Sequence, residues 1–344
     1  MPKRFSKNEW GFAGVMGIQA TAILALQIYI LTQWQIWVKS TVTQVTISFT
    51  VPIDIAILIF ACFYAGILAL DAIYSRNNIL LLAICVSNCL ILAFAAMQYR
   101  ELLQTSITLP QARDMYDESL VHLDRDWWAY VQPAELATNL ILGVCILPTW
   151  YFAYKVHSEY KWVIYRRIHG DSTIKIKYLA YEIYLVLTKF NFFFSIGFII
   201  QYNLIDVHFE EPEYSLTMAL IPVVFFAMVL GIWFVRKEWK WAMIGIIICY
   251  LALIAYFLSR IITLYGDGWR ALTAGKDKML LFSITAVCLT TLSLAFAIQC
   301  IVNFDQGLRS VISEAGGHKL APYDFRSISS PSPRTSHSSR FGVD

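Results

Sequence analysis

The chain has 344 residues, of which 58% are hydrophobic and 15% are charged, and its net charge is +3. Soluble domains are about half apolar and about a quarter charged, so this composition indicates an integral membrane protein. A net charge this small does not suggest nucleic acid as a partner. All seven cysteines lie inside apolar stretches, which argues against a disulfide-stapled extracellular module.

Apolar stretches of about 20 residues, long enough to cross the hydrocarbon core of a bilayer, recur along the chain. Eight spans are predicted, at residues 11–36, 48–70, 78–97, 134–154, 178–202, 214–234, 241–262 and 279–302. The predicted fold class is therefore an all-α integral membrane protein, a bundle of about eight transmembrane helices. The bundle occupies residues 11–305, between an N-terminal segment at 1–10 and a tail at 306–344.

The basic residues predict the orientation of the spans, because cytosolic connections carry the excess of Lys and Arg. With the N-terminus in the cytosol, the basic segments 3–7, 155–177 and 236–240 share one side. The longer connections on the other side, at 100–132 and 203–213, are rich in Asp and Glu. Both termini are therefore expected in the cytosol. The basic N-terminus also enters the first span without a small-residue cleavage site, so that span should be retained.

Acidic residues lie inside or at the edge of two early spans. Asp54 follows Pro52 in the second span, and Glu135 begins the fourth. A charged side chain in hydrocarbon is costly and normally has a partner inside the bundle. Both acids are therefore candidate members of a buried polar cluster.

The connection between the fourth and fifth spans is the most basic one. In KVHSEYKWVIYRRIHG, Val156 and Tyr160 have helical spacing, and basic residues surround the polar side. This pattern suits a helix that lies in the headgroup layer and attracts anionic lipids, although it also fits ordinary positive-inside composition. The candidate contacts with anionic lipid or a cytosolic protein partner are Lys155, Lys161, Arg166, Arg167, Lys175 and Lys177.

The fifth span, YLAYEIYLVLTKFNFFFSIGFIIQY, places Lys189 near its middle. An ammonium there costs roughly 2.5 to 3.5 kcal/mol on insertion scales, so it normally faces the bundle interior and is paired. Glu182 shares its helix face but lies about 10 Å away along the axis, which strains a direct pair. Asp54, Glu135 and backbone carbonyls are the other candidate partners. Either a structural role in helix register or a place in a ligand or ion pathway would account for the lysine.

Asn191 follows two residues later, and the pattern predicts a hydrogen bond from it to another helix. Asn191 and Lys189 are grouped with Glu182, Asp54 and Glu135 as the candidate buried polar cluster.

The chain turns polar from about residue 306 and ends in FRSISSPSPRTSHSSRFGVD. This composition predicts a disordered tail. Ser330 and Ser332 each precede a proline and are candidate phosphorylation sites.

Catalytic and metal-binding motifs are absent from the sequence. All six histidines lie in predicted connections or the tail, and no HExxH, glycine-rich phosphate loop or G-x-S-x-G occurs. We therefore expect no metal, no cofactor and no catalytic residue, and a protein that is not an enzyme.

The segment YRRIHGDSTIKIKYLAYEIYLVLTKFNFFFSIGFIIQY resembles a fungal family of uncharacterised multi-pass Golgi apparatus membrane proteins. The shared pattern is a basic-aromatic run, a Gly-Asp turn, and a span with Lys and several Phe; here its residues are Tyr165, Arg166, Gly170, Asp171, Lys189, Phe190, Phe192, Phe193, Phe194 and Gln201. The chain departs from it at Asn191, where the family pattern has an acid. The resemblance implies residence in the Golgi membrane and no established activity.

Three functions are compatible with these observations. The first is a non-enzymatic Golgi membrane protein with a structural, sorting or lipid-associated role. The second is a transporter or channel with Lys189 in a polar path, although no inverted repeat or broken helix pair is visible. The third, weaker one is a seven-helix receptor-like protein with an extra N-terminal span, which rests on topology alone.

Overall fold

Eight long helices make up most of the computed structural model, which describes residues 6–39, 46–113, 118–167, 172–207, 213–266 and 275–304. They are α1 (Lys7–Trp37), α2 (Thr46–Ser75), α3 (Asn78–Thr108), α4 (Trp127–Arg167), α5 (Ser172–Gln201), α6 (Glu213–Lys237), α7 (Lys240–Tyr265) and α8 (Lys276–Val302). A 3₁₀ turn, η2 (Leu109–Gln111), follows α3, and a π-helical turn, η3 (Tyr202–Val207), follows α5. All eight helices are long and apolar enough to cross a membrane, which confirms the predicted number of such helices.

Local sequence explains where the first helices begin. The Ser6 hydroxyl accepts a hydrogen bond from the backbone N–H of Glu9, and the Glu9 carboxylate accepts one from the backbone N–H of Ser6. This reciprocal capping box satisfies two backbone donors that a helix start leaves free. Asn77 caps α3 in a related way, accepting hydrogen bonds from the N–H groups of Ile79 and Leu80.

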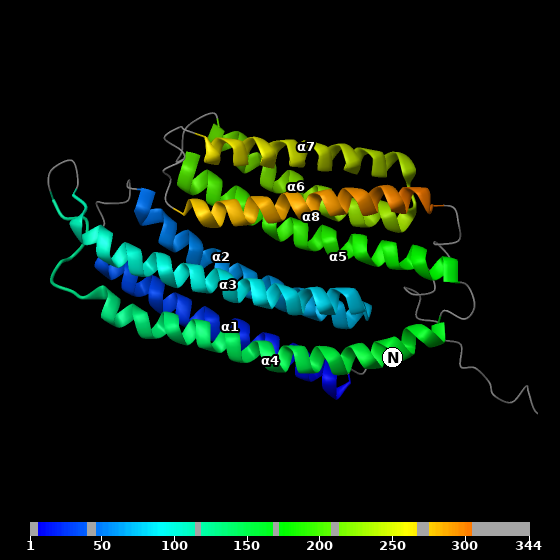
Figure 1. Cartoon of the computed structure of the whole chain (residues 1–344), viewed down its shortest axis with the longest axis horizontal. Helices are drawn as coiled ribbons and strands as arrows, with labels where there is room; N and C mark the ends of the chain where they lie inside the picture. The colour runs from blue at the N-terminus through cyan, green and yellow to red at the C-terminus, as the bar shows by residue number, and fades with distance from the viewer. Residues whose placement is uncertain are drawn as a thin grey trace, which may run out of the picture.

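The helices form two four-helix halves, α1–α4 and α5–α8 (Figure 1). Within the first half, α1 packs along α4 and α2, and α3 packs along α2 and α4. Within the second half, α8 packs between α5 and α7, and α6 packs against both α5 and α7. The backbones of the two halves approach each other more sparsely, mainly where α2 and α3 face α5 and η3.

The helices run alternately up and down, so the bundle has two distinct ends (Figure 1). We call the end where α1, α3, α5 and α7 begin the N-terminal end, and the end where α2, α4, α6 and α8 begin the far end. At the far end, Trp37 stacks on Trp127 with ring centroids 4.7 Å apart, and Trp34 packs edge-on against both rings. These tryptophans are buried and hold the first half together at that end.

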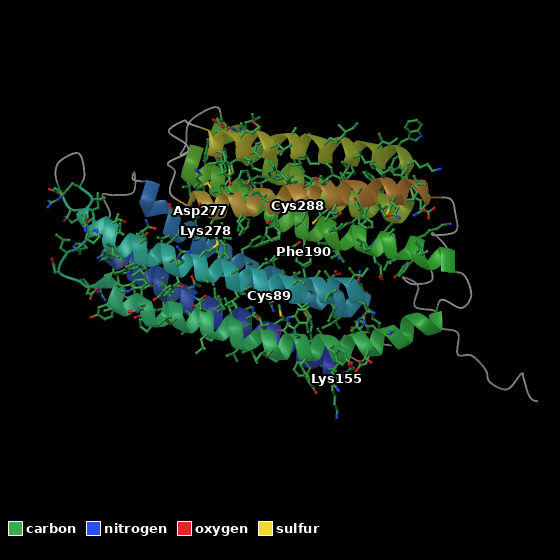
Figure 2. The ribbon with its side chains drawn as sticks, in the orientation of Figure 1. Cys89, Lys155, Phe190, Asp277, Lys278 and Cys288 are labelled. Atoms are coloured by element: carbon green, nitrogen blue, oxygen red, sulfur yellow. The ribbon has the colours of Figure 1, made fainter. Side chains whose placement is uncertain are left out.

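The basic stretch after the fourth predicted span continues α4 and does not form a separate helix. α4 extends to Arg167, and the buried Val156 and Tyr160 pack within the main hydrophobic core. The Tyr160 hydroxyl donates a hydrogen bond to Glu9 at 2.7 Å. Two residues assigned to a membrane-facing apolar side therefore face protein, because the helix does not bend away from the bundle here. The exposed Lys155 remains on the outer side of α4 (Figure 2).

In the second half, α5 and α8 come close together at a glycine. A Cβ atom added to Gly197 would overlap the ring of Phe282 on α8. The ring of Phe282 also contacts the rings of Phe193 and Phe194, with centroids 6.0 and 5.4 Å apart. The close approach of α5 and α8 depends on the absence of a side chain at Gly197 alone. It involves no repeated motif of small residues.

Candidate functional site between the halves

The most deeply buried basic residue in the described chain is a lysine at the start of α8. Lys278 has 1% of its side chain exposed, and its Nζ lies 2.6 Å from Oδ2 of Asp54 on α2. The same Nζ lies 2.5 Å from Oε2 of Glu101 on α3. It also lies 5.2 Å from the centre of the Phe94 ring. Lys278 therefore connects the second half of the protein to two helices of the first half.

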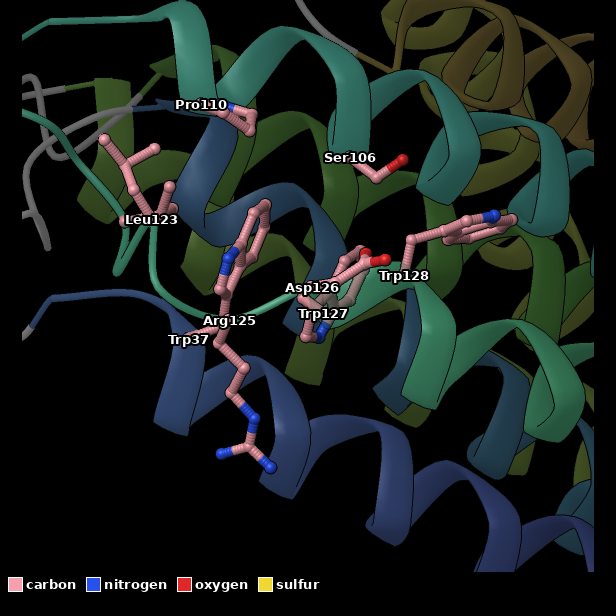
Figure 3. A pocket seen from close by; sticks show the side chains of 9 residues that line it. Trp37, Ser106, Pro110, Leu123, Arg125, Asp126, Trp127 and Trp128 are labelled. Atoms are coloured by element: carbon pink, nitrogen blue, oxygen red, sulfur yellow. The ribbon is translucent and has the colours of Figure 1, made fainter.

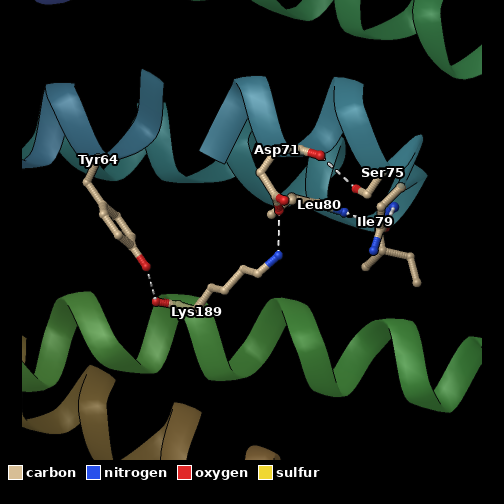
Figure 4. Close-up of polar contacts among 7 residues, drawn as sticks. Tyr64, Asp71, Ser75, Ile79, Leu80 and Lys189 are labelled. Atoms are coloured by element: carbon tan, nitrogen blue, oxygen red, sulfur yellow. Dashed lines mark hydrogen bonds and ion pairs between the residues drawn. The ribbon is translucent and has the colours of Figure 1, made fainter. Parts of the chain in front are cut away.

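A second lysine connects the halves nearer the N-terminal end. Lys189 on α5 forms a short ion pair with Asp71 on α2, and its backbone carbonyl accepts a hydrogen bond from Tyr64 at 2.7 Å (Figure 4). Lys189 and Asp71 are more accessible than the Lys278 pair, with 17% and 38% of their side chains exposed. A paired lysine between helices was expected, but Asp71 was not among the candidate partners.

The two contacts share one charge pattern. The first half supplies the carboxylates Asp54, Asp71 and Glu101, and the second half supplies Lys189 and Lys278. Asp54 and Asp71 are 17 residues apart on α2, which corresponds to about 26 Å along a helix. The halves are therefore joined by complementary charge toward each end of their interface. We call these contacts the far-end pair, centred on Lys278, and the N-terminal pair, Lys189–Asp71.

An apolar cavity lies between the two pairs. It has a volume of about 90 Å³ and is lined by residues of α2, α3, α5 and α8. Ala61 and Ala65 line its α2 wall, and Phe190 lines its α5 wall, where Figure 2 shows it between the halves. Leu90 and Leu281 also line it and are 46% and 37% exposed, so the cavity reaches the outer surface between α3 and α8.

Three hydroxyl-bearing residues line this cavity, and each has a hydrogen-bond partner: Tyr64 donates to the backbone carbonyl of Lys189 on α5, and the other two donate within their own helices. Ser87 donates a hydrogen bond to the carbonyl of Ile84 at 2.9 Å, and Thr285 donates one to the carbonyl of Leu281 at 2.7 Å. Because these hydroxyl groups are already hydrogen-bonded, the cavity wall is effectively apolar toward a bound molecule.

The sequence grouped five residues into one buried polar cluster, and the structure separates them. Asp54 pairs with Lys278, not with Lys189. Glu135, which is fully buried in the first half, accepts a hydrogen bond from Gln98 at 3.1 Å.

The remaining acid of that group, Glu182, is also buried away from the lysine. It has a hydrogen bond from Tyr178, one turn earlier on α5. The single-cluster expectation was therefore wrong, because each acid has a partner nearer than Lys189.

Asn191 makes the interhelical contact that its position predicted. Its side-chain oxygen accepts hydrogen bonds from Thr290 of α8 at 2.7 Å and from Ser195 of α5 at 3.3 Å. Both hydroxyls are fully buried. Asn191 therefore joins α5 to α8 inside the second half and faces away from the N-terminal pair.

Sequence reasoning missed three residues that join the halves. Lys278 was assigned to a connection, although it directly precedes an apolar stretch and α8 begins two residues before it. Glu101 and Asp71 fell just beyond the predicted third and second spans, but α3 and α2 both extend past them. The helices are longer than the bilayer minimum, so charges counted as connections lie within the bundle.

Several expected sites lie partly or wholly outside the described residues. The side chains of Arg166, Arg167 and Lys175 are outside them, as are Ser330 and Ser332 of the tail. Lys155 and Lys161 are described and exposed, as lipid or partner contacts would require. Lys177 is partly exposed. Among the described residues, no group of three or more His, Cys, Asp or Glu side chains could hold a metal ion.

A second pocket, of about 110 Å³, lies at the far end of the first half (Figure 3). Trp37, Trp127 and Trp128 line it together with Arg125 and Asp126. The Arg125 guanidinium donates a hydrogen bond to Gln33 at 3.1 Å and lies over the Tyr130 ring. The pocket therefore borders the tryptophan packing of the first half and is separate from the interface between the halves.

The fold and the site define an α-helical multi-pass membrane protein whose two halves are joined by buried and half-buried charge pairs. Comparison with known proteins finds a similar chain, a UPF0658 Golgi apparatus membrane protein of Schizosaccharomyces pombe. The two are 25% identical over 274 residues, which cover 76% of this chain and 78% of the relative. No family model matches the chain, and no solved structure is significantly similar to it.

This similarity confirms the resemblance carried by the fifth span, to a fungal family of Golgi membrane proteins without an established activity. It also confirms the predicted localisation, that of a multi-pass protein of the Golgi apparatus membrane.

Proposed function

We propose that this protein is a non-enzymatic, lipid-associated component of the Golgi membrane that accommodates an acyl chain of a membrane lipid between its two halves. The observation that carries this proposal is the apolar cavity lined by α2, α3, α5 and α8. Ligand pockets are mostly apolar, and the lining of this cavity is of that kind.

The position of the cavity favours a lipid chain over a soluble ligand. It lies between the two charge pairs along α2, where the spanning helices face the hydrocarbon core, and it reaches the surface beside Leu90 and Leu281. The molecules available at that depth are acyl chains. Apolar cavities of this kind stay free of water and take apolar ligands.

The charge pairs give the cavity a defined width. Asp54 and Asp71 on α2 bind lysines of the second half on either side of the cavity-lining residues Ala61 and Ala65. The helices are therefore held at both ends of the interface while the middle remains incompletely packed. A lipid chain there would supply the contacts that the two halves do not make with each other.

The orientation proposed from the basic residues places both termini in the cytosol. The exposed Lys155 and Lys161 would then lie on the cytosolic face, within reach of anionic headgroups or a protein partner. The far-end pair would lie toward the lumen.

Photo-crosslinking in lipid nanodiscs tests the proposal. The full chain is reconstituted with a phosphatidylcholine that carries a photoreactive group along its acyl chain, and the labelled peptides are mapped by mass spectrometry. We expect labelling of the cavity wall, including Phe190. Ala65→Phe should fill the cavity and remove that labelling, whereas Ala252→Phe, on the exposed side of α7, should not.

Labelling that is confined to the outer surface, or that persists at Phe190 in the Ala65→Phe variant, would refute the proposal. Ala61→Phe provides a second blocking variant on the same wall. Each variant is compared with wild type for its elution as a single folded species.

A further inference from the structure

A fully buried polar network lies inside the first half, separate from the cavity. Gln98 on α3 donates hydrogen bonds to Gln27 on α1 at 2.9 Å and to Glu135 on α4 at 3.1 Å. Gln27 in turn donates to the hydroxyl of Thr138 at 3.3 Å. All four side chains are at most 1% exposed. Such a network is costly in hydrocarbon unless every polar atom has a partner.

Three oxygen atoms of this region have no such partner. Oε2 of Glu135, Oε1 of Gln98 and Oδ1 of Asn139 are buried and accept no hydrogen bond from the described chain. The hydrogen bond between Gln98 and Glu135 keeps these two side chains in contact, and Asn139 lies one turn beyond Glu135 on α4. The Asn139 amide donates to the backbone carbonyl of Glu135 at 3.0 Å, which leaves its own oxygen free.

The charge balance around Glu135 is negative. Among the described residues, the cation found to act on Glu135 is Lys278, which already contacts Asp54 and Glu101. The neighbouring residues Gln27 and Gln98, on the packed helices α1 and α3, are neutral. Three carboxylates therefore share one ammonium among the described residues. An uncompensated carboxylate in a low-dielectric interior costs several kcal/mol, so a further positive charge would be strongly stabilised there.

We propose that Glu135, Gln98 and Asn139 form a binding site for one small monovalent cation between α3 and α4. Carboxylate and amide oxygens are hard ligands suited to such a cation, and the three free oxygens are of this type. A single positive charge would balance the carboxylate that Lys278 leaves uncompensated. The charge arrives either as an alkali metal ion at the three oxygens or as a proton on the Glu135 carboxyl. The site is independent of the acyl-chain cavity.

Thermal unfolding of the full chain in nanodiscs of neutral lipid tests the site. Ionic strength is held constant with choline chloride while Na⁺ or K⁺ replaces choline at fixed pH; a second series lowers the pH at fixed salt. A ligand that binds only the folded state raises the melting temperature with its concentration. We expect a saturable rise in one series, and the series in which it occurs distinguishes an alkali metal ion from a proton.

Two variants and a matched control assign the effect to the site. Glu135→Gln should abolish the rise of the melting temperature with Na⁺ or K⁺, or reduce its rise at low pH, because the substitution removes the charge and keeps the shape of the side chain. Asn139→Ala should lower the affinity of the site for an alkali metal ion by about tenfold, the scale seen when a supporting ligand is lost. Glu182→Gln changes another buried glutamate, on α5, and should leave the response to Na⁺ or K⁺ intact.

Stability that responds to neither series would overturn the proposal and leave an ordered water as the partner of these oxygens. The same holds if Glu135→Gln responds as wild type does. If Glu135→Gln does not fold, the Asn139→Ala variant tests whether an alkali metal ion binds at this site. Gln98→Leu then decides between the two forms: it should weaken the response to an alkali ion by removing one ligand oxygen, whereas it should move the response to a proton to higher pH by removing a hydrogen bond to the carboxylate. Cavity labelling in the crosslinking experiment does not depend on Glu135, so the two proposals fail separately.

Discussion

Replacing Lys278 with methionine should destabilise the protein far more than the same replacement at Lys189. Methionine keeps most of the length of the lysine side chain and removes the charge. Lys278 and Asp54 have 1% and 4% of their side chains exposed, so Lys278→Met leaves a buried carboxylate without its partner. Removing one member of a buried pair typically costs about 3 to 5 kcal/mol.

Replacing Lys189 of the N-terminal pair should lower the stability much less. Asp71 has 38% of its side chain exposed and can be solvated when Lys189 is replaced. Ion pairs with this accessibility are usually worth about 0 to 1 kcal/mol. The difference between the two variants should therefore be about 2 to 5 kcal/mol, although the sequence alone marks Lys189 as the more unusual residue.

Equilibrium unfolding in mixed micelles, driven by increasing SDS and followed by the fluorescence of the 11 tryptophans, measures both variants. The double variant Lys278→Met with Asp54→Asn should recover part of the loss, because the unpaired charge is then gone. Equal costs at the two lysines, or a cost at Lys278 below about 1 kcal/mol, would show that the far-end pair does not have the burial and pairing described here.

Three further predictions concern other contacts. Gly197→Ala should destabilise the protein by about 1 to 3 kcal/mol by overpacking against Phe282, and Phe282→Leu should relieve part of it; additive costs in a double-variant unfolding cycle would refute the contact. Asn191→Leu should cost about 0.5 to 1.5 kcal/mol because the hydrogen bond between α5 and α8 is lost while the Thr290 hydroxyl keeps the carbonyl of Ala286 as an acceptor, and an unchanged SDS midpoint would contradict this. A protease added to sealed Golgi vesicles should remove epitope tags at both ends of the chain; protection of either tag would overturn the predicted orientation.

The number of helices was predictable from the sequence because each span is a long apolar stretch, and this signal depends on local composition. The residues at which the helices begin and end were less predictable. The third predicted span stops at residue 97, whereas α3 extends to Thr108 and places Glu101 within the bundle. A hydropathy minimum marks where hydrocarbon ends, but a helix continues as long as tertiary contacts satisfy its polar residues.

The pairing of the charges was not predictable, because it depends on how the two halves face each other. Lys189 and Asp71 are 118 residues apart, and Asp54 is equally plausible as a partner when only the sequence is considered. The contact of Asn191 with another helix was predictable as a type of interaction, but Thr290 was not predictable as the partner. The cavity has no sequence signal, since its lining residues are ordinary apolar residues of four helices.

The far-end pair imposes an order of events on biosynthesis. Asp54 and Lys278 are 224 residues apart, and Lys278 lies in the first turn of α8, the last of the eight described helices. The first half, whose contacts are internal, is complete well before its final counter-charge has been translated. Asp54 and Glu101 must therefore remain without that partner while half of the protein is still being inserted. Only after α8 enters the membrane does the chain reach its final charge balance, so a chain that ends before α8 is left incompletely neutralised.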